Sequence, residues 1–194
     1  MARPLKPLPI VSNLPRFNPI VPVRRPDIFN SSDWVYEIKY DGFRALAYVD
    51  DGRCRFVSRK GNEMKRFEQL STMVGKALKV KSAVLDGEIV ALDESGMPAF
   101  WHLMRRKCHA VYYAFDLLWL DGKDLLNLPL LERKKILRSI LPQKSSWIGY
   151  VNFIGHTRAK RLFELVKAKD LEGLVAKRKD GRYHPAARWF KVEN

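Results

Sequence analysis

Alternation of apolar and polar residues begins at residue 33, after an N-terminal stretch with little periodicity. In residues 34–40 an apolar set at even positions alternates with a set that includes Glu37 and Lys39. A period of two predicts a strand with one apolar face and places Glu37 and Lys39 together on the other face. Residues 43–59 predict two more strands, joined by a tight turn at Asp51-Gly52.

The rest of the pattern predicts helices set among further strands. Helical spacing of apolar residues, with Pro98 or Pro129 near a start and Thr157 as a cap, predicts helices over 63–80, 98–107, 128–141 and 157–169. The further strands are predicted over 82–92 (interrupted at Asp86-Gly87-Glu88), 109–122, 146–155, 171–179 and 188–194. Because strands predominate and hairpins pair them, we expect an α+β domain of mostly antiparallel sheets.

Residues 1–30 differ from the rest of the chain. They hold seven of the eleven prolines, so we expect an extended Pro-rich N-terminal arm there and a folded domain over residues 31–194. No apolar run reaches membrane-spanning length, and no signal peptide is evident. The two cysteines, Cys54 and Cys108, lack metal-type spacing and fit a reducing compartment, which favours a cytoplasmic location.

The charge narrows the class of partner. The chain has a formal net charge of +15 and a pI near 10.0. Such an excess is compatible with general basicity that aids solubility, or with a polyanionic partner. A domain pI above about 9 favours nucleic acid, whose binding would then depend strongly on salt.

The stretch "EIKYDGFR" at residues 37–44 carries the first candidate chemistry. Lys39 ends its strand at an Asp-Gly turn, so its amine lies at a rim, where Gly42 permits close approach of a ligand or another strand. Arg44, on the next strand, offers a planar guanidinium suited to phosphate. A lysine on a strand is usually an exposed residue, and only its neighbours make this one a candidate.

This stretch resembles the nucleotidyl-lysine motif of the covalent nucleotidyltransferases, the superfamily of ATP-dependent DNA ligases, RNA ligases and mRNA capping enzymes. Segments similar to its other motifs follow in order: "SRKG" at 58–61, "LDGEIV" at 85–90, "YYAFDLLWLDG" at 112–122, "EGLVAK" at 172–177 and "WFKVEN" at 189–194. The set is most similar to the bacterial ATP-dependent DNA ligases. The resemblance implies an ATP-grasp-like α+β adenylation domain, with two antiparallel sheets flanked by helices and a nucleotide pocket between them. The chain ends directly after the last motif, so no OB domain is expected within it.

The resemblance also implies roles for individual residues. Lys39 would be the nucleophile that becomes bonded to AMP. The residues implied in nucleotide binding are Glu37 and Ile38 near the adenine edge, Glu88 at the ribose, Phe115 stacked on the base, and Arg44, Arg59, Lys177 and Lys191. Glu172 and Glu88 would hold Mg²⁺ or Mn²⁺, and DNA would contact Arg44, Arg59, Arg178 and Arg182. Phe115 could equally be a core aromatic residue, because Tyr113 shares its face.

The nucleophile poses an electrostatic problem. A free lysine is almost wholly protonated at neutral pH, since its pKa is about 10.4. Neighbouring cations and a metal ion would lower the pKa of such a group, and Lys177 and Lys191 are candidate neighbours of Lys39.

The resulting hypothesis is an ATP-dependent DNA ligase domain, active as a monomer in the cytoplasm or on the nucleoid. Lys39 would take AMP from ATP, AMP would pass to the 5′-phosphate of nicked double-stranded DNA, and the 3′-hydroxyl would seal the nick. Other repair proteins are expected as partners, and a membrane is not. Two alternatives remain open: RNA ligation or capping by the same chemistry, and a catalytically weakened module that only binds nucleic acid.

One position departs from the family pattern. The last motif usually carries a second lysine two residues after the first, and here that position is Glu193. A carboxylate about 4 Å from a phosphate oxygen would be opposed by roughly 4 kcal/mol at an effective dielectric constant near 20. Glu193 would therefore point away from the phosphate, act through a metal, or weaken a chemical step, lysine adenylation above all.

Overall fold

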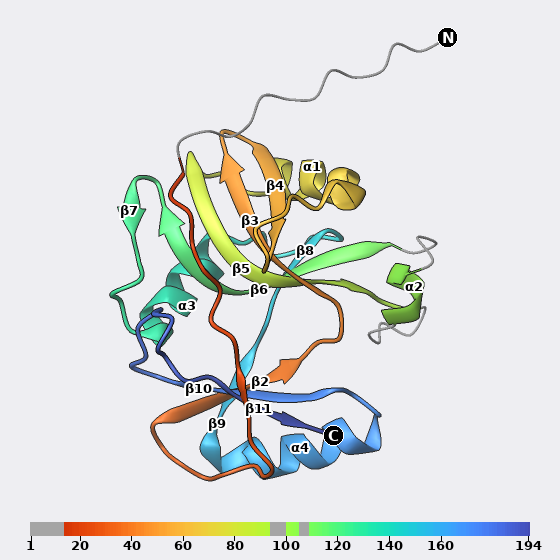
Figure 1. The fold of residues 1–194 in the computed structure, drawn as a ribbon, viewed down its shortest axis with the longest axis vertical. Helices are drawn as coiled ribbons and strands as arrows, with labels where there is room; N and C mark the ends of the chain where they lie inside the picture. The colour runs from red at the N-terminus through yellow and green to blue at the C-terminus, as the bar shows by residue number, and fades with distance from the viewer. Residues whose placement is uncertain (1–13, 94–99, 105–108) are drawn as a thin grey trace.

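The structure, a computed structural model, describes residues 14–93, 100–104 and 109–194. A larger sheet lies at one end of the elongated molecule and a smaller sheet at the other (Figure 1). Residues 1–13 of the expected arm, Pro98 and Cys108 lie outside the described residues. The division between an arm over residues 1–30 and a domain over residues 31–194 stays a prediction.

The larger sheet contains six strands within the described residues, with β4-β3-β5-β6-β7 in order and β8 paired to β6. Its strands are β3 (Phe43–Asp50), β4 (Arg53–Ser58), β5 (Ser82–Ala91), β6 (Ala110–Leu120), β7 (Lys123–Asp124) and β8 (Ile148–Tyr150). The predicted hairpin between β3 and β4 is confirmed, with Asp51 and Gly52 both at positive φ. All pairings in this sheet are antiparallel except that of β6 with β8.

The smaller sheet has the strand order β1-β11-β10-β2-β9 over the same described part of the chain. Its strands are β1 (Val23–Arg24), β2 (Trp34–Lys39), β9 (Phe153–Gly155), β10 (Gly173–Arg178) and β11 (Phe190–Glu193). They pair antiparallel, apart from β1 with β11. The prediction of an α+β fold with two sheets is therefore confirmed.

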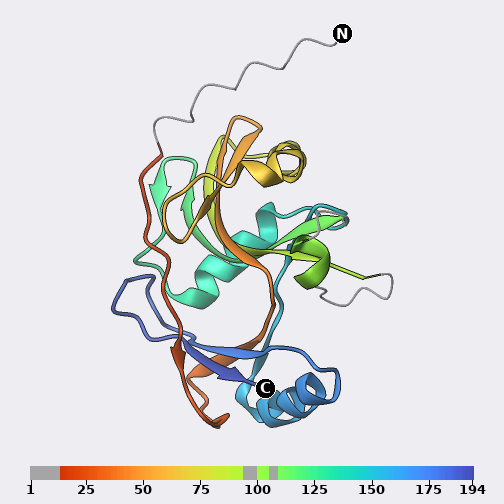
Figure 2. The same ribbon diagram turned by 45° about the vertical axis from the view of Figure 1, so that its right-hand side comes forward.

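Helices cover the sheets, as the amphipathic patterns indicate. They are α1 (Glu68–Ala77), α2 (Phe100–Met104), α3 (Leu130–Ile140) and α4 (Ala159–Ala168), with short 3-10 turns at Lys65–Phe67 and His156–Arg158. The helix α4 lies against the outer face of the smaller sheet, where Ala159 packs with Tyr36 and Ala176 (Figure 2). The predicted cap was wrong: Thr157 lies within the 3-10 turn, and no side chain caps α4.

Two strand predictions need correction. The segment 146–155 is not one strand, because β8 ends at Tyr150 in the larger sheet and β9 starts at Phe153 in the smaller one. The segment 82–92 is not interrupted at Asp86-Gly87-Glu88. It forms the continuous strand β5, and the irregularity lies in its pairing with β6, which shifts register between Val84 and Leu85 and between Asp86 and Gly87. Such bulges bend a strand without ending it.

The core lies mainly under the larger sheet, where α1 and α3 supply its cover. Within the described residues, no helix has the length and apolar character required to cross a membrane. The strand β2 also departs from a simple one-faced pattern, since Glu37, on its polar face, is only 2% exposed. Both faces of β2 are therefore covered, and the polar face is turned toward the larger sheet.

Candidate active site

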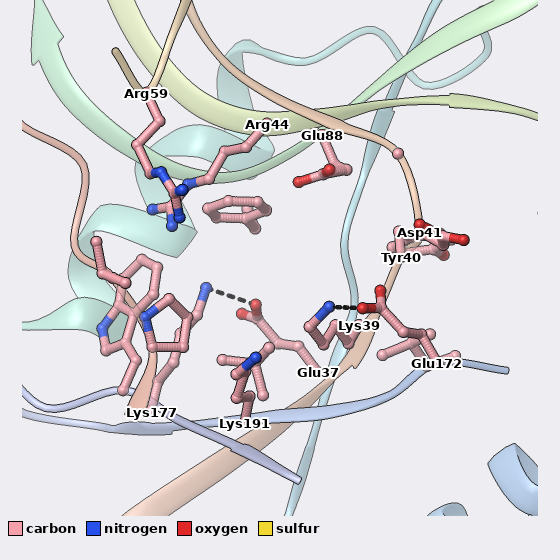
Figure 3. Close-up of a pocket in the computed structure, with 17 residues that line it drawn as sticks. Glu37, Lys39, Tyr40, Asp41, Arg44, Arg59, Glu88, Glu172, Lys177 and Lys191 are labelled. Carbon is pink, nitrogen blue, oxygen red and sulfur yellow. Dashed lines mark hydrogen bonds and ion pairs between the residues drawn. The ribbon is translucent and has the colours of Figure 1, made fainter. Parts of the chain in front are cut away.

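A cleft of about 270 Å³ lies between the two sheets. Ten of the twelve residues singled out from the sequence line this cleft, and Figure 3 shows most of them with their polar ends converging: Glu37, Ile38, Lys39, Arg44, Arg59, Glu88, Phe115, Glu172, Lys177 and Lys191. These residues come from six strands of two sheets, together with the segments that flank them. The fold therefore brings together groups that are far apart in the sequence.

The register of the smaller sheet explains much of this convergence. Lys39, Gly173 and Glu193 are direct neighbours across β2, β10 and β11. Two residues further along each strand, Glu37, Val175 and Lys191 form a second such row. Residues directly opposite in a sheet share a face, so the two rows present their polar side chains to the same cleft.

Lys39 forms an ion pair with Glu172 across the mouth of the cleft (Figure 3). The side chains of Lys39 and Glu172 remain 21% and 32% exposed. Gly173, which follows Glu172, permits the close approach of β11, because it sits at φ 151° and a Cβ there would overlap the backbone of β11. The amine is therefore held in a cavity, within reach of solvent and of an incoming ligand.

A second ionic group lies deeper in the cleft, beneath the first. The Glu37 carboxylate lies 2.5 Å from Lys134 Nζ and 2.6 Å from Lys177 Nζ. Lys134 Nζ also donates to the carbonyl oxygens of Phe115 and Val151, at 3.2 and 3.1 Å. Burial lowers the pKa of Lys177 in spite of the opposing effect of Glu37, and the like charge of Lys134 acts in the same direction as burial. We refer to Glu37, Lys134 and Lys177 as the inner cluster.

The expected cationic neighbours of Lys39 are each engaged elsewhere. Lys177 pairs with Glu37, and Lys191 Nζ lies 2.7 Å from Glu193 Oε1. The group in contact with Lys39 is an anion, Glu172. The expectation that Lys177 and Lys191 would act on the Lys39 amine therefore stays a prediction, since both lysines are paired with other carboxylates.

Arg44 projects into the cleft from the larger sheet and is firmly held. Its guanidinium donates to both oxygens of Asp86, at 3.0 and 2.7 Å, and to the carbonyl oxygen of Ile20 at 2.5 Å. Asp86 is fully buried and also accepts a hydrogen bond from the Tyr183 hydroxyl at 2.6 Å. Asp86 therefore fixes Arg44 in place, while Glu88, two residues further along β5, lines the cleft.

The pKa of the Glu88 carboxyl lies well above its ordinary value. Burial raises its pKa to about 8, although the nearby cations Arg44 and Lys39 oppose the shift. At neutral pH the carboxyl is therefore mostly protonated. A neutral carboxyl suits the hydroxyl groups of a sugar, and a cation bound nearby would draw off its proton.

The fit to a metal ion rests mainly on Glu172. Across the residues that the structure describes, no three His, Cys, Asp or Glu side chains are grouped so that they could hold a metal ion. Mg²⁺ commonly takes one or two carboxylates and completes its shell with water and substrate phosphates. The partly exposed Glu172 fits that pattern, and Glu88 fits it once deprotonated.

Two residues predicted to contact DNA lie outside the cleft. Arg178 follows Lys177 on β10, so its side chain points to the other face, and it pairs with Asp180 at 2.9 Å. Arg182 is exposed in the loop that follows. The structure neither groups these two arginines with Lys39 nor buries them, and their role stays a prediction.

Sequence reasoning missed Trp189, which lines the cleft, and Lys134, which pairs with the cleft residue Glu37. Lys134 shares a stripe with Leu130, Leu137 and Leu141 at helical spacing, and it is 1% exposed. A lysine on the apolar stripe of a helix is a signal that could have found it. Trp189 is 5% exposed, with its ring 4.0 Å from Lys177 Nζ and edge-on to Phe115.

These arrangements match a known class of enzyme domain. The sequence model for the ATP dependent DNA ligase domain matches residues 25–193, and the chain belongs to that family. The predicted family is therefore confirmed, and DNA ligase is supported over RNA ligase or capping enzyme.

The chain is similar to bacterial proteins named for non-homologous end joining and for DNA ligation. The multifunctional non-homologous end joining protein LigD of Mycolicibacterium smegmatis is 34% identical over 176 residues, which are 84% of this chain and 22% of LigD. The SPbeta prophage-derived DNA ligase-like protein LigB of Bacillus subtilis is 32% identical over 178 residues, 86% of this chain and 63% of LigB. A solved structure of mycobacterial DNA ligase D complexed with ATP and MES has a TM-score of 0.74 and 29% identity, over 91% of this chain and 60% of that one. The chain thus spans about a fifth of LigD and well over half of LigB.

Proposed function

We propose that this chain joins nicked DNA through a covalent intermediate in which Lys39 carries AMP. The observation that supports the proposal is the position of the Lys39 amine at the rim of a cleft, with Glu172 on one side and Arg44, Lys177 and Lys191 along its walls. Cations so placed would bind the triphosphate of ATP and stabilise charge as it develops on the α-phosphate.

In the first step, Lys39 Nζ attacks the α-phosphorus, a P–N bond forms, and pyrophosphate leaves. The ammonium must lose its proton beforehand, and Glu172, already in contact with it, is placed to accept that proton. An oxygen of the 5′-phosphate at the nick then attacks the phosphorus of lysyl-AMP, the P–N bond breaks, and Lys39 recovers its amine. The 3′-hydroxyl attacks that phosphate, forms the phosphodiester bond and releases AMP. Mg²⁺ or Mn²⁺, held by Glu172 together with Glu88, would supply Lewis-acid stabilisation of the phosphates.

The walls of the cleft suit a purine nucleotide. The Phe115 ring lines the cleft, with Lys177 Nζ 4.3 Å and the Arg44 guanidinium carbon 5.4 Å from its centre, and a flat apolar ring of this kind would stack on a base. The Glu88 carboxyl would pair with ribose hydroxyls. Each carboxylate oxygen of Glu37 already pairs with a lysine. Each oxygen also has a second lone pair, which would accept a hydrogen bond from an adenine amino group.

The test is covalent labelling. The protein is incubated with Mg²⁺ and ATP or GTP labelled at the α-phosphate, then resolved on a denaturing gel. We expect an ATP-dependent band that Lys39→Ala abolishes and that Lys60→Ala, at an exposed lysine, leaves intact. A chase with nicked duplexes whose broken strand is DNA or RNA then identifies the acceptor. A GTP-dependent band would favour capping chemistry, and a protein that binds DNA but never labels would contradict the proposal.

A further inference from the structure

The segment ahead of the matched family region contributes to the cleft. Residues 14–24 precede the match, which starts at residue 25, yet Val21 and Pro22 are among the residues that line the cleft. In both views of the fold this segment runs as an extended chain from the larger sheet to the smaller one (Figures 1 and 2). We refer to residues 17–25 as the strap.

The strap is fastened to the larger sheet at one end. Its Phe17 N–H donates to the Tyr48 hydroxyl at 3.2 Å, and its Ile20 N–H donates to the Tyr183 hydroxyl at 3.3 Å. The Ile20 side chain is 1% exposed, within an apolar cluster that includes Trp189. Because the Ile20 carbonyl oxygen accepts from Arg44, the strap also helps to orient a guanidinium of the cleft.

The other end of the strap is fastened to the strand that carries Lys191. The Val23 N–H donates to the Trp189 carbonyl oxygen at 2.8 Å, and the Arg25 N–H donates to the Lys191 carbonyl oxygen at 2.9 Å. Arg24 lies directly beside Lys191 in the register, and its side chain is 3.6 Å from Glu193. Without the strap, β11 would be an unpaired edge of the smaller sheet.

Val21 and Pro22 therefore span the gap between two cations, Arg44 of one sheet and Lys191 of the other. We propose that the strap is a wall of the nucleotide site and that Val21 contacts the bound nucleotide on the side of its phosphates. The inference rests on the proposed nucleotide site. It explains why Val21 keeps an apolar side chain 55% exposed at the mouth of a strongly polar cleft: a nucleotide would cover it.

The chain offers a matched control. Val23 is 53% exposed, nearly the same as Val21, but it is paired in register with Phe190. Phe190 belongs to the apolar cluster on the outer face of the smaller sheet, so Val23 points away from the cleft. Since both valines are exposed, a glutamate at either position should leave the fold intact, which thermal unfolding of each variant checks.

The experiment measures ATP binding by calorimetry in the presence of EDTA, for the full chain and for Val21→Glu, Val21→Lys and Val23→Glu. A carboxylate beside the phosphates should weaken binding about tenfold in Val21→Glu, or about 1.4 kcal/mol. We expect Val23→Glu to stay within about twofold and Val21→Lys to bind at least as tightly as the parent. Equal dissociation constants for Val21→Glu and Val23→Glu would overturn the inference.

Covalent labelling of the same proteins separates this inference from the proposed function. If the parent chain labels normally and the two glutamate variants bind ATP equally, the ligase proposal stands and the strap is not a wall of the nucleotide site. Selective loss of ATP binding in Val21→Glu, with no lysyl-AMP formed by the parent, supports the wall and contradicts the transfer chemistry. If the parent chain binds no ATP, both proposals fall.

Discussion

Two charged groups on one face of β2 differ sharply in their surroundings. Glu37 is 2% exposed and faces two lysines that are at least as buried. Lys39, two residues further along, pairs with Glu172, and both remain partly open to solvent. A buried ion pair is costly to break, whereas a partly exposed pair exchanges its partner at little cost. The inner cluster is thus suited to hold the site rigid, and the Lys39–Glu172 pair to release an amine.

The largest effect on stability should come from breaking the inner cluster. Lys134→Met removes one of two cations from Glu37 and the donor to two carbonyl oxygens. We expect the free energy of unfolding to fall by about 3 kcal/mol, because one partner of a buried ion pair is lost. Urea denaturation measures the change. Lys135→Met, at the exposed neighbouring position, is the control, and equal stabilities would show that the inner cluster does not hold the two sheets together.

A smaller effect should appear as a pH dependence of stability from Glu88. Its pKa is about 8 in the folded protein, against 4.5 as the ordinary value. Between these values the folded state keeps a proton that the unfolded chain has lost, so stability falls as pH rises through this range and levels off above pH 8. We expect a loss of about 1–2 kcal/mol, less than the shift alone implies because the side chain is not fully buried.

Denaturation series from pH 5 to pH 9 measure this slope. Glu88→Gln should flatten it, and Glu63→Gln, at an exposed carboxylate, should not. An unchanged slope in Glu88→Gln would mean that Glu88 is ionised like an ordinary surface carboxylate. The contrast between buried and partly exposed charged groups on β2 would then have no counterpart at Glu88 in the larger sheet.

Breaking the Lys39–Glu172 pair should change the rate of the chemical step much more than the stability of the fold. In Glu172→Gln we expect the free energy of unfolding to change by less than about 1 kcal/mol, because both partners are partly exposed. The rate of lysyl-AMP formation should nevertheless fall at least tenfold, since general-base assistance is typically worth about 10²-fold or more. Single-turnover labelling measures the rate, with the exposed Glu164→Gln as control. A large loss of stability with normal labelling would show that the Lys39–Glu172 pair stabilises the fold and does not assist the chemical step.

The smallest change in stability is expected at Glu193. Its bond to Lys191 lowers the pKa of the Glu193 carboxyl, and both side chains are about a quarter to a third exposed. Glu193→Gln should change the free energy of unfolding by no more than about 0.5 kcal/mol. It should raise the rate of lysyl-AMP formation a few fold, because Lys191 is freed for phosphate. Slower labelling than in the parent would indicate that Glu193 orients Lys191 productively.

Much of this site was accessible from the sequence because motif residues lie at strand ends. The alternation in β2 placed Glu37 and Lys39 on one face, and the register of β10 brought Glu172 beside them. The sequence did not reveal how the charges pair, because motif positions alone do not say which lysine contacts which carboxylate. Lys177 was a candidate neighbour of Lys39, and in the structure it forms an ion pair with Glu37.

The errors in the fold have physical causes as well. The apolar run at residues 146–155 looks like one strand because both halves are suited to a pleated sheet, and only tertiary pairing divides it. The arm rich in proline gives no periodic signal, so its contact with Arg44 and with β11 could not be inferred. Lys134 was missed because a basic residue on a helix is ordinarily assigned to solvent.

The short crossing between β8 and β9 sets a limit on how far the sheets can part. Only Val151 and Asn152 separate Tyr150 of the larger sheet from Phe153 of the smaller one. Three Cα–Cα steps of about 3.8 Å cannot stretch beyond roughly 11 Å, and Val151 is further anchored to Lys134. The covalent link therefore limits the distance between the two sheets at this point. Any wider separation of the two sheets would have to occur away from this edge.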